Sequence, residues 1–172
     1  PAPPPSPPPP TSPPPSPPPY PPGSNFYLFT FDSSDEQSNG WSTGPTNSGN
    51  GAATGSSPYG FNWRTGSTPS VGSGPVFGYG GSGRYYYAEA SSPRQQGDIF
   101  DLVYDGTSLC GSGVIREVEF KYHMFGPNMG SLALLSDPAG ATLWSQSGQP
   151  ATNPNDWKGV STGHLSTGTT GI

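Results

Sequence analysis

The chain is poor in charge, in cysteine and in long apolar runs, and each shortage excludes a class of protein. Only 10% of its 172 residues are charged, with 6 basic against 11 acidic residues and a net charge of −5. It therefore offers no positive surface to nucleic acid or to an anionic membrane. No apolar run approaches the roughly 20 residues that cross a bilayer, so neither nucleic-acid binding nor membrane insertion is expected.

The single cysteine, Cys110, cannot form a disulfide within the chain. Two interpretations remain open for it: a small, half-buried side chain near a turn, or one half of an intermolecular bridge. Helix signals are absent as well, because no window of eleven or more residues repeats apolar residues at helical spacing. Gly, Ser, Thr and Asn instead separate short apolar runs, which is typical of an all-β domain with many turns.

Proline and glycine are abundant, with 25 and 26 residues, but proline is unevenly placed. Residues 1–22, here called the proline segment, hold 16 of the 25 prolines. The other 150 residues hold all 8 Phe, all 4 Trp and all but one of the 9 Tyr, enough for one domain core. We expect one domain over 23–172. Because the chain begins at Pro1 without a signal peptide, we also expect a processed protein or a fragment of a longer one.

The proline segment is predicted to form a polyproline II helix. Proline fixes φ near −65° and disfavours helical ψ in the residue before it. At ~3.1 Å per residue, the 22 residues would extend over roughly 70 Å, with backbone carbonyls open to solvent, sugar or a partner.

Ser6, Ser12 and Ser16 each begin a run of three or four prolines. This pattern resembles the Ser-Pro repeats of hydroxyproline-rich, extensin-like cell-wall glycoproteins of plants and green algae. The resemblance implies hydroxylated prolines that carry O-glycans, at Pro4, Pro5, Ser6, Pro8, Pro9, Pro10, Ser12, Pro14, Pro15, Ser16, Pro18 and Pro19. An unmodified stiff linker, or a ligand for aromatic-lined grooves, remains the alternative. Tyr20 is a candidate partner-binding residue.

Six segments outside the proline segment are predicted to be strands. They are 25–32, 83–91, 98–104, 114–124, 130–136 and 141–145. Residues 137–140, Asp-Pro-Ala-Gly, suit a hairpin turn, and 38–57 suits a surface loop. Short strands at this spacing predict an antiparallel two-sheet sandwich, jelly-roll-like.

The alternation over 114–124 predicts which residues face the core. Val118, Phe120 and Tyr122 should point inward, with Phe120 fully buried, while the charged residues Glu117, Glu119 and Lys121 should point outward.

An ordered set of short motifs resembles the MAM domain, a β-sandwich module of extracellular proteins, over roughly residues 25–165. The matching motifs are Phe29-x-Phe31-Asp32, Gly40-Trp41, Phe61-x-Trp63-Arg64, Thr68-Pro69-Ser70, Gly74-Pro75, Gly83-x-Tyr85-Tyr86, Glu89-Ala90-Ser91, Val118-x-Phe120-x-Tyr122-His123-Met124-x-Gly126, Met129-Gly130-x-Leu132, Leu143-Trp144 and Asp156-Trp157. The chain departs from the family pattern in two ways. Asn39 and Glu117 stand where the family places cysteines, and the closing C-terminal strand is expected to be missing.

Catalysis is not predicted. No nucleophile elbow, phosphate loop or zinc-spaced His/Cys set occurs, and no organic cofactor is expected. Glu117 and Glu119 would project from one face of a strand at a spacing that glycosidases use, although alternation on a solvated strand explains them better. His123 belongs to the family pattern, which implies a structural role.

Two kinds of binding site are weighed against simpler explanations. Asp32, Asp35 and Glu36 could hold a structural Ca²⁺ or form a solvated acidic turn; Asp98, Asp101 and Asp105 form a weaker cluster. Several aromatic residues could stack on sugars or pack in the core. These residues are Trp63, Phe77, Tyr79, Tyr85, Tyr86 and Tyr87, of which Tyr86 is a candidate for ligand or partner binding.

The sequence predicts a secreted structural or adhesive glycoprotein of a cell wall, cell surface or extracellular fibril. A MAM-like domain would mediate self-association or contact with other extracellular glycoproteins, and the proline segment would be a glycan-bearing spacer. Fibre contacts are expected at residues 1–22 and 159–172. The alternative is a carbohydrate-binding module on a glycosylated stalk.

Overall fold

The computed structural model describes residues 24–32, 39–43, 59–60, 62–65, 67–68, 70–92, 94–165 and 168–172. The described part is all-β. Its strands are β1 (Trp41–Thr43), β2 (Tyr59–Gly60), β3 (Asn62–Thr65), β4 (Arg84–Tyr87), β5 (Phe100–Tyr104), β6 (Glu119–Tyr122), β7 (Ser131–Leu135), β8 (Thr142–Ser147) and β9 (Lys158–Ser161).

Helix is limited, within these ranges, to the 3₁₀ turn η1 (Tyr79–Gly81) and the single-turn α2 (Thr107–Cys110). None of the helical residues in the described part belongs to a helix with the length and apolar character needed to cross a membrane.

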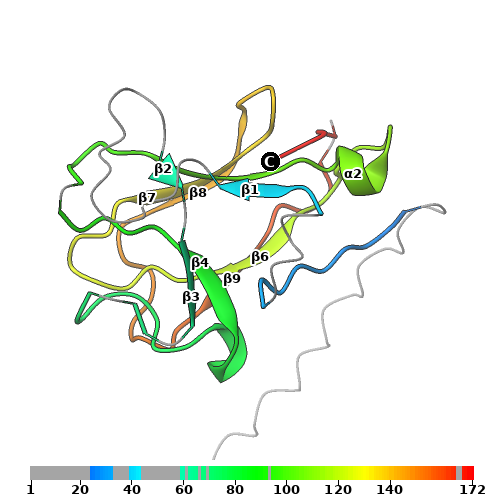
Figure 1. Cartoon of the computed structure of the whole chain (residues 1–172). Helices are drawn as coiled ribbons and strands as arrows, with labels where there is room; N and C mark the ends of the chain where they lie inside the picture. Colours follow the sequence, from blue (N-terminus) through cyan, green and yellow to red (C-terminus); the bar gives the residue numbers. More distant parts are fainter. Residues whose placement is uncertain are drawn as a thin grey trace, which may run out of the picture.

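The strands form small sheets (Figure 1). A three-stranded sheet has the order β1-β5-β2, in which β1 is antiparallel to β5 and β2 is parallel to it. Three antiparallel pairs, β3–β4, β6–β9 and β7–β8, complete the set that the described ranges contain. A two-stranded sheet is marginal by itself, so contacts between the pairs must stabilise the domain.

The predicted strands at 83–91, 98–104, 130–136 and 141–145 correspond to β4, β5, β7 and β8. The turn between the last two is also confirmed, since Gly140 N donates to Ser136 O at 2.6 Å and Ser136 N donates to Ala141 O at 2.9 Å. This hairpin could be predicted because its apolar runs and its Pro-Gly turn are adjacent in sequence.

The predicted strand at 25–32 is wrong. Residues 24–32 include no strand, and Phe31 has a φ of +60°, in the left-handed region that interrupts an extended run. The segment is held by its rings instead. Phe29 and Phe31 pack against Trp41, with ring centroids 5.5 and 5.0 Å apart.

The prediction for 114–124 is correct only in part, because the strand is limited to Glu119–Tyr122. In β6 the alternation is confirmed: Phe120 and Tyr122 are half-buried, and Glu119 and Lys121 are exposed. Phe120 is not fully buried as predicted. Glu117 is half-buried rather than outward, and its carboxylate accepts a hydrogen bond from Ser161 Oγ at 3.1 Å.

The prediction of a continuous loop over 38–57 is also wrong at one point, since β1 lies inside that range. Trp41 is opposite Tyr104 in the β1–β5 ladder, and their rings lie 5.0 Å apart. Residues 44–57 lie outside the described residues. The strand forms because an aromatic contact with a distant strand outweighs the weak local preference of a Gly/Ser-rich stretch.

The core is built from aromatic clusters rather than from one block of aliphatic side chains. Tyr85 and Tyr104 are each 5% exposed, and Met124 and Ala151 are also buried. One cluster contains Phe29, Phe31, Trp41, Tyr86 and Tyr104. A second contains Phe120, Tyr122 and Trp144. Each cluster joins elements that belong to different sheets.

The C-terminal residues lie against the end of β5 (Figure 1). Tyr104 N donates to Ile172 O at 2.6 Å and Ile172 N donates to Tyr104 O at 3.0 Å, while Gly171 bridges both Asp105 and Asp137. The end of the chain therefore joins β5 to the β7–β8 turn. The absence of the MAM family's closing strand stays a prediction.

Candidate functional site

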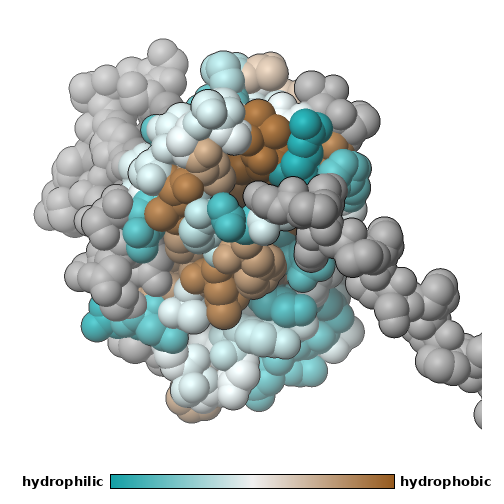
Figure 2. Space-filling model, turned by 90° about the vertical axis from the view of Figure 1, so that its right-hand side faces the viewer, coloured by the Kyte–Doolittle hydropathy of each residue, from teal (hydrophilic) through white to brown (hydrophobic). Residues whose placement is uncertain are grey.

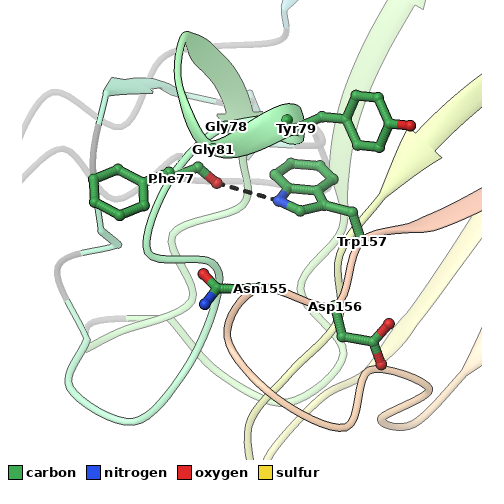
Figure 3. A pocket seen from close by; sticks show the side chains of 8 residues that line it. Phe77, Gly78, Tyr79, Gly81, Asn155, Asp156 and Trp157 are labelled. Carbon is green, nitrogen blue, oxygen red and sulfur yellow. Dashed lines mark hydrogen bonds between the residues drawn. The ribbon is translucent and has the colours of Figure 1, made fainter.

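A hollow of about 340 Å³ opens between η1 and the loop that leads into β9 (Figure 3). We call it the aromatic hollow. Its lining residues come from two short runs of the chain and are Phe77, Gly78, Tyr79, Gly80, Gly81, Asn155, Asp156 and Trp157. Three of these eight are aromatic and three are glycine, so rings and bare backbone form much of its wall.

The η1 side of the hollow is shaped by glycine. A Cβ on Gly78 would lie 2.2 Å from Ser82 O, so only glycine allows this close turn. Gly80 has a φ of +81°, which also favours glycine. The tight turn displays the neighbouring rings, since Phe77 is 50% exposed and Tyr79 is 59% exposed.

The opposite wall is Trp157, whose ring is fixed from several sides. Its Nε1 donates to Phe77 O at 3.2 Å, as Figure 3 shows, and this bond ties the two walls together. The indole lies 5.8 Å from the ring of buried Tyr85 and 6.4 Å from that of Tyr79, nearly perpendicular to both. These contacts hold the indole in one orientation.

The charge of Asp156 is balanced by Lys158, and a second lysine lies near the hollow. Asp156 Oδ2 accepts hydrogen bonds from Thr152 N at 2.7 Å and Thr152 Oγ1 at 2.8 Å, and forms an ion pair with Lys158 at 2.8 Å. The hydrogen bond from Lys158, followed by those from Thr152, lowers the pKa of Asp156 to about 2. The ammonium of Lys121 lies 5.3 Å from the centre of the Tyr79 ring, a cation–π arrangement.

His123 does not line the hollow, but its ring lies 5.5 Å from that of Trp157. Its Nε2 is 3.3 Å from Asn153 O, and its Nδ1 is buried with no hydrogen-bond partner in the described part of the chain. Burial lowers the pKa of His123, although the Asn153 carbonyl and the Asp156 carboxylate act in the opposite direction. The neutral imidazole therefore supports the position of Trp157.

The residues predicted to hold Ca²⁺ cannot be placed together. Asp35 and Glu36 lie outside the described residues, and Asp32 Oδ1 accepts a hydrogen bond from Arg84 N at 2.7 Å. Asp98 Oδ2 accepts from Gln95 N, and Asp105 Oδ1 accepts from Thr107. No three His, Cys, Asp or Glu residues form a metal-binding group within the ranges that the structure covers.

The two predicted partner-binding tyrosines have different outcomes. Tyr20 and all the predicted glycosylation positions lie outside the described residues. Tyr86 is half-buried, and its ring packs 5.0 Å from that of Phe31. It belongs to the first aromatic cluster.

Several motifs that carry the MAM resemblance meet in space. Phe31 packs on Trp41 and on Tyr86, and these three residues come from three separate motifs. Gly40, with a φ of +102°, lies so close to Asp105 that a Cβ would be 2.1 Å from its carbonyl oxygen. Glycine is therefore required at position 40.

Sequence reasoning singled out Phe77 and Tyr79 as aromatic residues but did not associate them with Trp157 or Asn155. The local signals were present: a glycine-rich run follows Phe77, and Asn153-Pro154-Asn155 is a turn sequence. The missing information was the contact between segments about 80 residues apart in the chain.

Comparison with known proteins does not assign the chain to a family. No family model matches the chain, and no solved structure matches it. The MAM resemblance and the resemblance of the proline segment to cell-wall glycoproteins stay predictions.

Proposed function

We propose that this chain is a structural or adhesive glycoprotein outside the cell. In this proposal its all-β domain is a MAM-like, jelly-roll-like sandwich that makes protein contacts, and the proline segment is a glycan-bearing spacer. Support for the sandwich comes from the meeting of the Phe29-x-Phe31, Gly40-Trp41 and Gly83-x-Tyr85-Tyr86 motifs in one aromatic cluster.

The observation that carries the proposal is an apolar surface directly after the proline segment. Phe26 is 73% exposed and Leu28 is 75% exposed. Figure 2 faces the side of the molecule on which residues 24–32 lie in Figure 1, and it shows hydrophobic side chains gathered in the middle of that face. Exposed apolar patches of this kind mark interaction surfaces.

The edge of β9 provides a second contact surface for assembly. Within the described ranges, β6 is the strand that pairs with β9, so the other edge of β9 can pair with a neighbouring chain. A contact between unlike surfaces does not close on itself and propagates as a filament. Fibre contacts through residues 1–22 and 159–172 are therefore proposed.

Deletion of residues 1–22 tests the assembly. The full chain should form larger species as its concentration rises, measured by sedimentation velocity and negative-stain microscopy, whereas the deleted chain should stay folded and monomeric. The variant Phe26→Ser/Leu28→Ser keeps the proline segment and should also weaken association. A deleted chain that forms the same fibre with the same repeat would refute the proposed role of the proline segment.

Intact mass measurement of the native protein tests the spacer. A mass above 17.8 kDa in steps of pentose or hexose would support glycosylation and an extracellular location. A mass equal to that of the unmodified chain would contradict glycosylation and favour the alternative of an unmodified, stiff linker.

A carbohydrate-binding module is the second candidate, favoured by the exposed Tyr79 ring beside Trp157. A pyranose ring can stack on such a face. Saturable glycan-array binding that is lost in Tyr79→Ala would support this candidate, and concentration-dependent self-association without sugar binding would support the first.

A further inference from the structure

We propose that the aromatic hollow binds the proline segment of a second copy of this chain. The proposal rests on the assembly described above and assigns its domain-side site. The four observations that carry it are the arrangement of the rings, the hydrogen-bonding groups that remain available, the absence of charge in the ligand, and the place where the segment joins the domain.

The rings in the hollow are arranged to receive a small ring. Tyr79 and Trp157 meet at 77°, with centroids 6.4 Å apart. The exposed ring of Tyr79 and the indole beside it offer apolar surface on which a pyrrolidine ring can pack. Grooves lined by aromatic side chains bind proline-rich segments in this way and benefit from the low entropy of a preformed polyproline II helix. The bare backbone of Gly80 and Gly81 leaves the rim open to a close approach.

The polar groups match a ligand that only accepts hydrogen bonds. A run of prolines has carbonyl oxygens and no N–H groups. The amide of Asn155 and, on the other side of Trp157 in Figure 3, the hydroxyl of Tyr79 can donate to such carbonyls. The indole N–H of Trp157 already donates to Phe77 O, and Asp156 Oδ2 already accepts from Thr152 and Lys158. A sugar, with many hydroxyl groups to satisfy, finds fewer unused partners here than a proline segment does.

Charge and composition agree with this assignment. Residues 1–22 contain no Asp, Glu, Lys or Arg, and the charge of Asp156 beside the hollow is balanced by Lys158. An uncharged ligand does not have to displace that ion pair, and it brings no charge near the Lys121 ammonium, which lies 5.3 Å from the centre of the Tyr79 ring. Binding should therefore depend little on ionic strength.

The position of the proline segment favours its binding to the hollow of a second copy over binding to the hollow of its own chain. The domain begins with residues 24–32, where the Tyr27 hydroxyl donates to Leu109 O of α2 at 3.0 Å. The hollow lies elsewhere, between η1 and the loop before β9. A polyproline II helix, which is the structure predicted for the segment, is stiff over several residues, and this favours contact with a neighbour over a return to the same domain. Its expected length of roughly 70 Å allows it to reach a neighbour.

The test uses the full, unmodified chain and a fluorescent synthetic peptide of residues 1–22, followed by anisotropy. We expect saturable binding that changes less than about threefold between low and high salt. Tyr79→Ala, at an exposed position, should weaken binding at least about tenfold, and Asn155→Ala should weaken it by less. Ile99→Ala, which is 64% exposed and outside the hollow, should have no effect. A peptide with Pro7, Pro13, Pro17 and Pro21 changed to Ala, four prolines outside the predicted glycosylation positions, should bind weakly or not at all.

Sedimentation of the same proteins separates this proposal from the proposed function. Reduced self-association of Tyr79→Ala, together with its weaker peptide binding, would support both. Self-association of the full chain without peptide binding, or with peptide binding unaffected by Tyr79→Ala, would overturn the hollow as the site and leave the proposed function standing. Peptide binding by a chain that stays monomeric would overturn the second-copy assignment. Absence of both peptide binding and self-association would overturn both proposals.

A galactose or arabinose oligosaccharide provides the last arm of the test. If it binds the wild-type chain but not Tyr79→Ala, and the peptide does not bind, the hollow is a carbohydrate site and the proposal is wrong.

Discussion

Replacement of Phe120 by alanine is the sharpest test of the core. Phe120 is half-buried in β6, and its ring meets that of Trp144 at 5.3 Å and 83° and that of Tyr122 at 6.0 Å. Half burial of a phenylalanine removes roughly 100 Å² from water, or about 2 kcal/mol after alanine's own share. The edge contact with Trp144 adds roughly 0.5–1 kcal/mol. Phe120→Ala should therefore lower the free energy of unfolding by about 3 kcal/mol.

Urea unfolding followed by tryptophan fluorescence and by circular dichroism measures this loss. The midpoint should fall with an unchanged m-value, and Tm should fall by roughly 6–12 °C for a domain of this size. The matched control is Glu119→Ala, because Glu119 is the preceding residue in β6 and is exposed. That change should stay within about 0.5 kcal/mol. Equal effects of the two substitutions would refute the inward position of Phe120.

Three further substitutions test the motifs and the support of the hollow. Gly40→Ala should lower the free energy of unfolding by at least about 2 kcal/mol in urea unfolding, or prevent folding, because its Cβ would meet a backbone oxygen at 2.1 Å. The control is Gly72→Ala, which also has a positive φ but lies in open space and should cost about 1 kcal/mol. Asp32→Ala should lower stability by about 1 kcal/mol in chemical denaturation, while Asp32→Asn keeps an acceptor for Arg84 N and should retain most of it. Because burial lowers the pKa of His123, the unfolded state binds more protons once the pH falls below the ordinary histidine value near 6.5. The contribution of His123 to Tm should therefore be constant above neutrality and decrease as the pH falls through that value towards the folded pKa, and the decrease in Tm should be smaller in His123→Gln.

The parts of the fold that the sequence predicted are those in which partners lie close together along the chain. The β7–β8 hairpin is an example, because its two apolar runs flank a Pro-Gly turn. The strands β4 and β5 could be predicted because aromatic and β-branched residues are concentrated within them.

The failures occur where distant contacts decide the local structure. Residues 25–32 have a strand composition, yet Phe29 and Phe31 serve the cluster around Trp41 and the backbone turns at Phe31. By contrast, β9 has only one apolar side chain, Val160, and becomes a strand because it pairs with β6. Neither outcome follows from composition, since each depends on a partner far along the chain.

At the aromatic hollow, too, local features could be predicted from the sequence and distant contacts could not. Exposed aromatic residues at 77 and 79 could be identified as candidates, because a glycine-rich turn displays rings. Their association with Trp157 could not, since it depends on the hydrogen bond from Trp157 Nε1 to Phe77 O and on the support from Tyr85 and His123.

Stability and binding share residues at the aromatic hollow, and this decides which variants are informative. Trp157 lines the hollow and also packs on Tyr85 of β4, thereby joining the loop before β9 to the β3–β4 pair. Since two-stranded sheets are marginal alone, loss of the indole would remove a contact between sheets together with the binding surface. Tyr79 comes from η1 and is 59% exposed, and in Figure 3 its ring points away from Phe77 and Asn155. A loss of binding in Tyr79→Ala can therefore be attributed to the site itself, whereas the same loss in Trp157→Ala would combine weaker binding with a weaker fold.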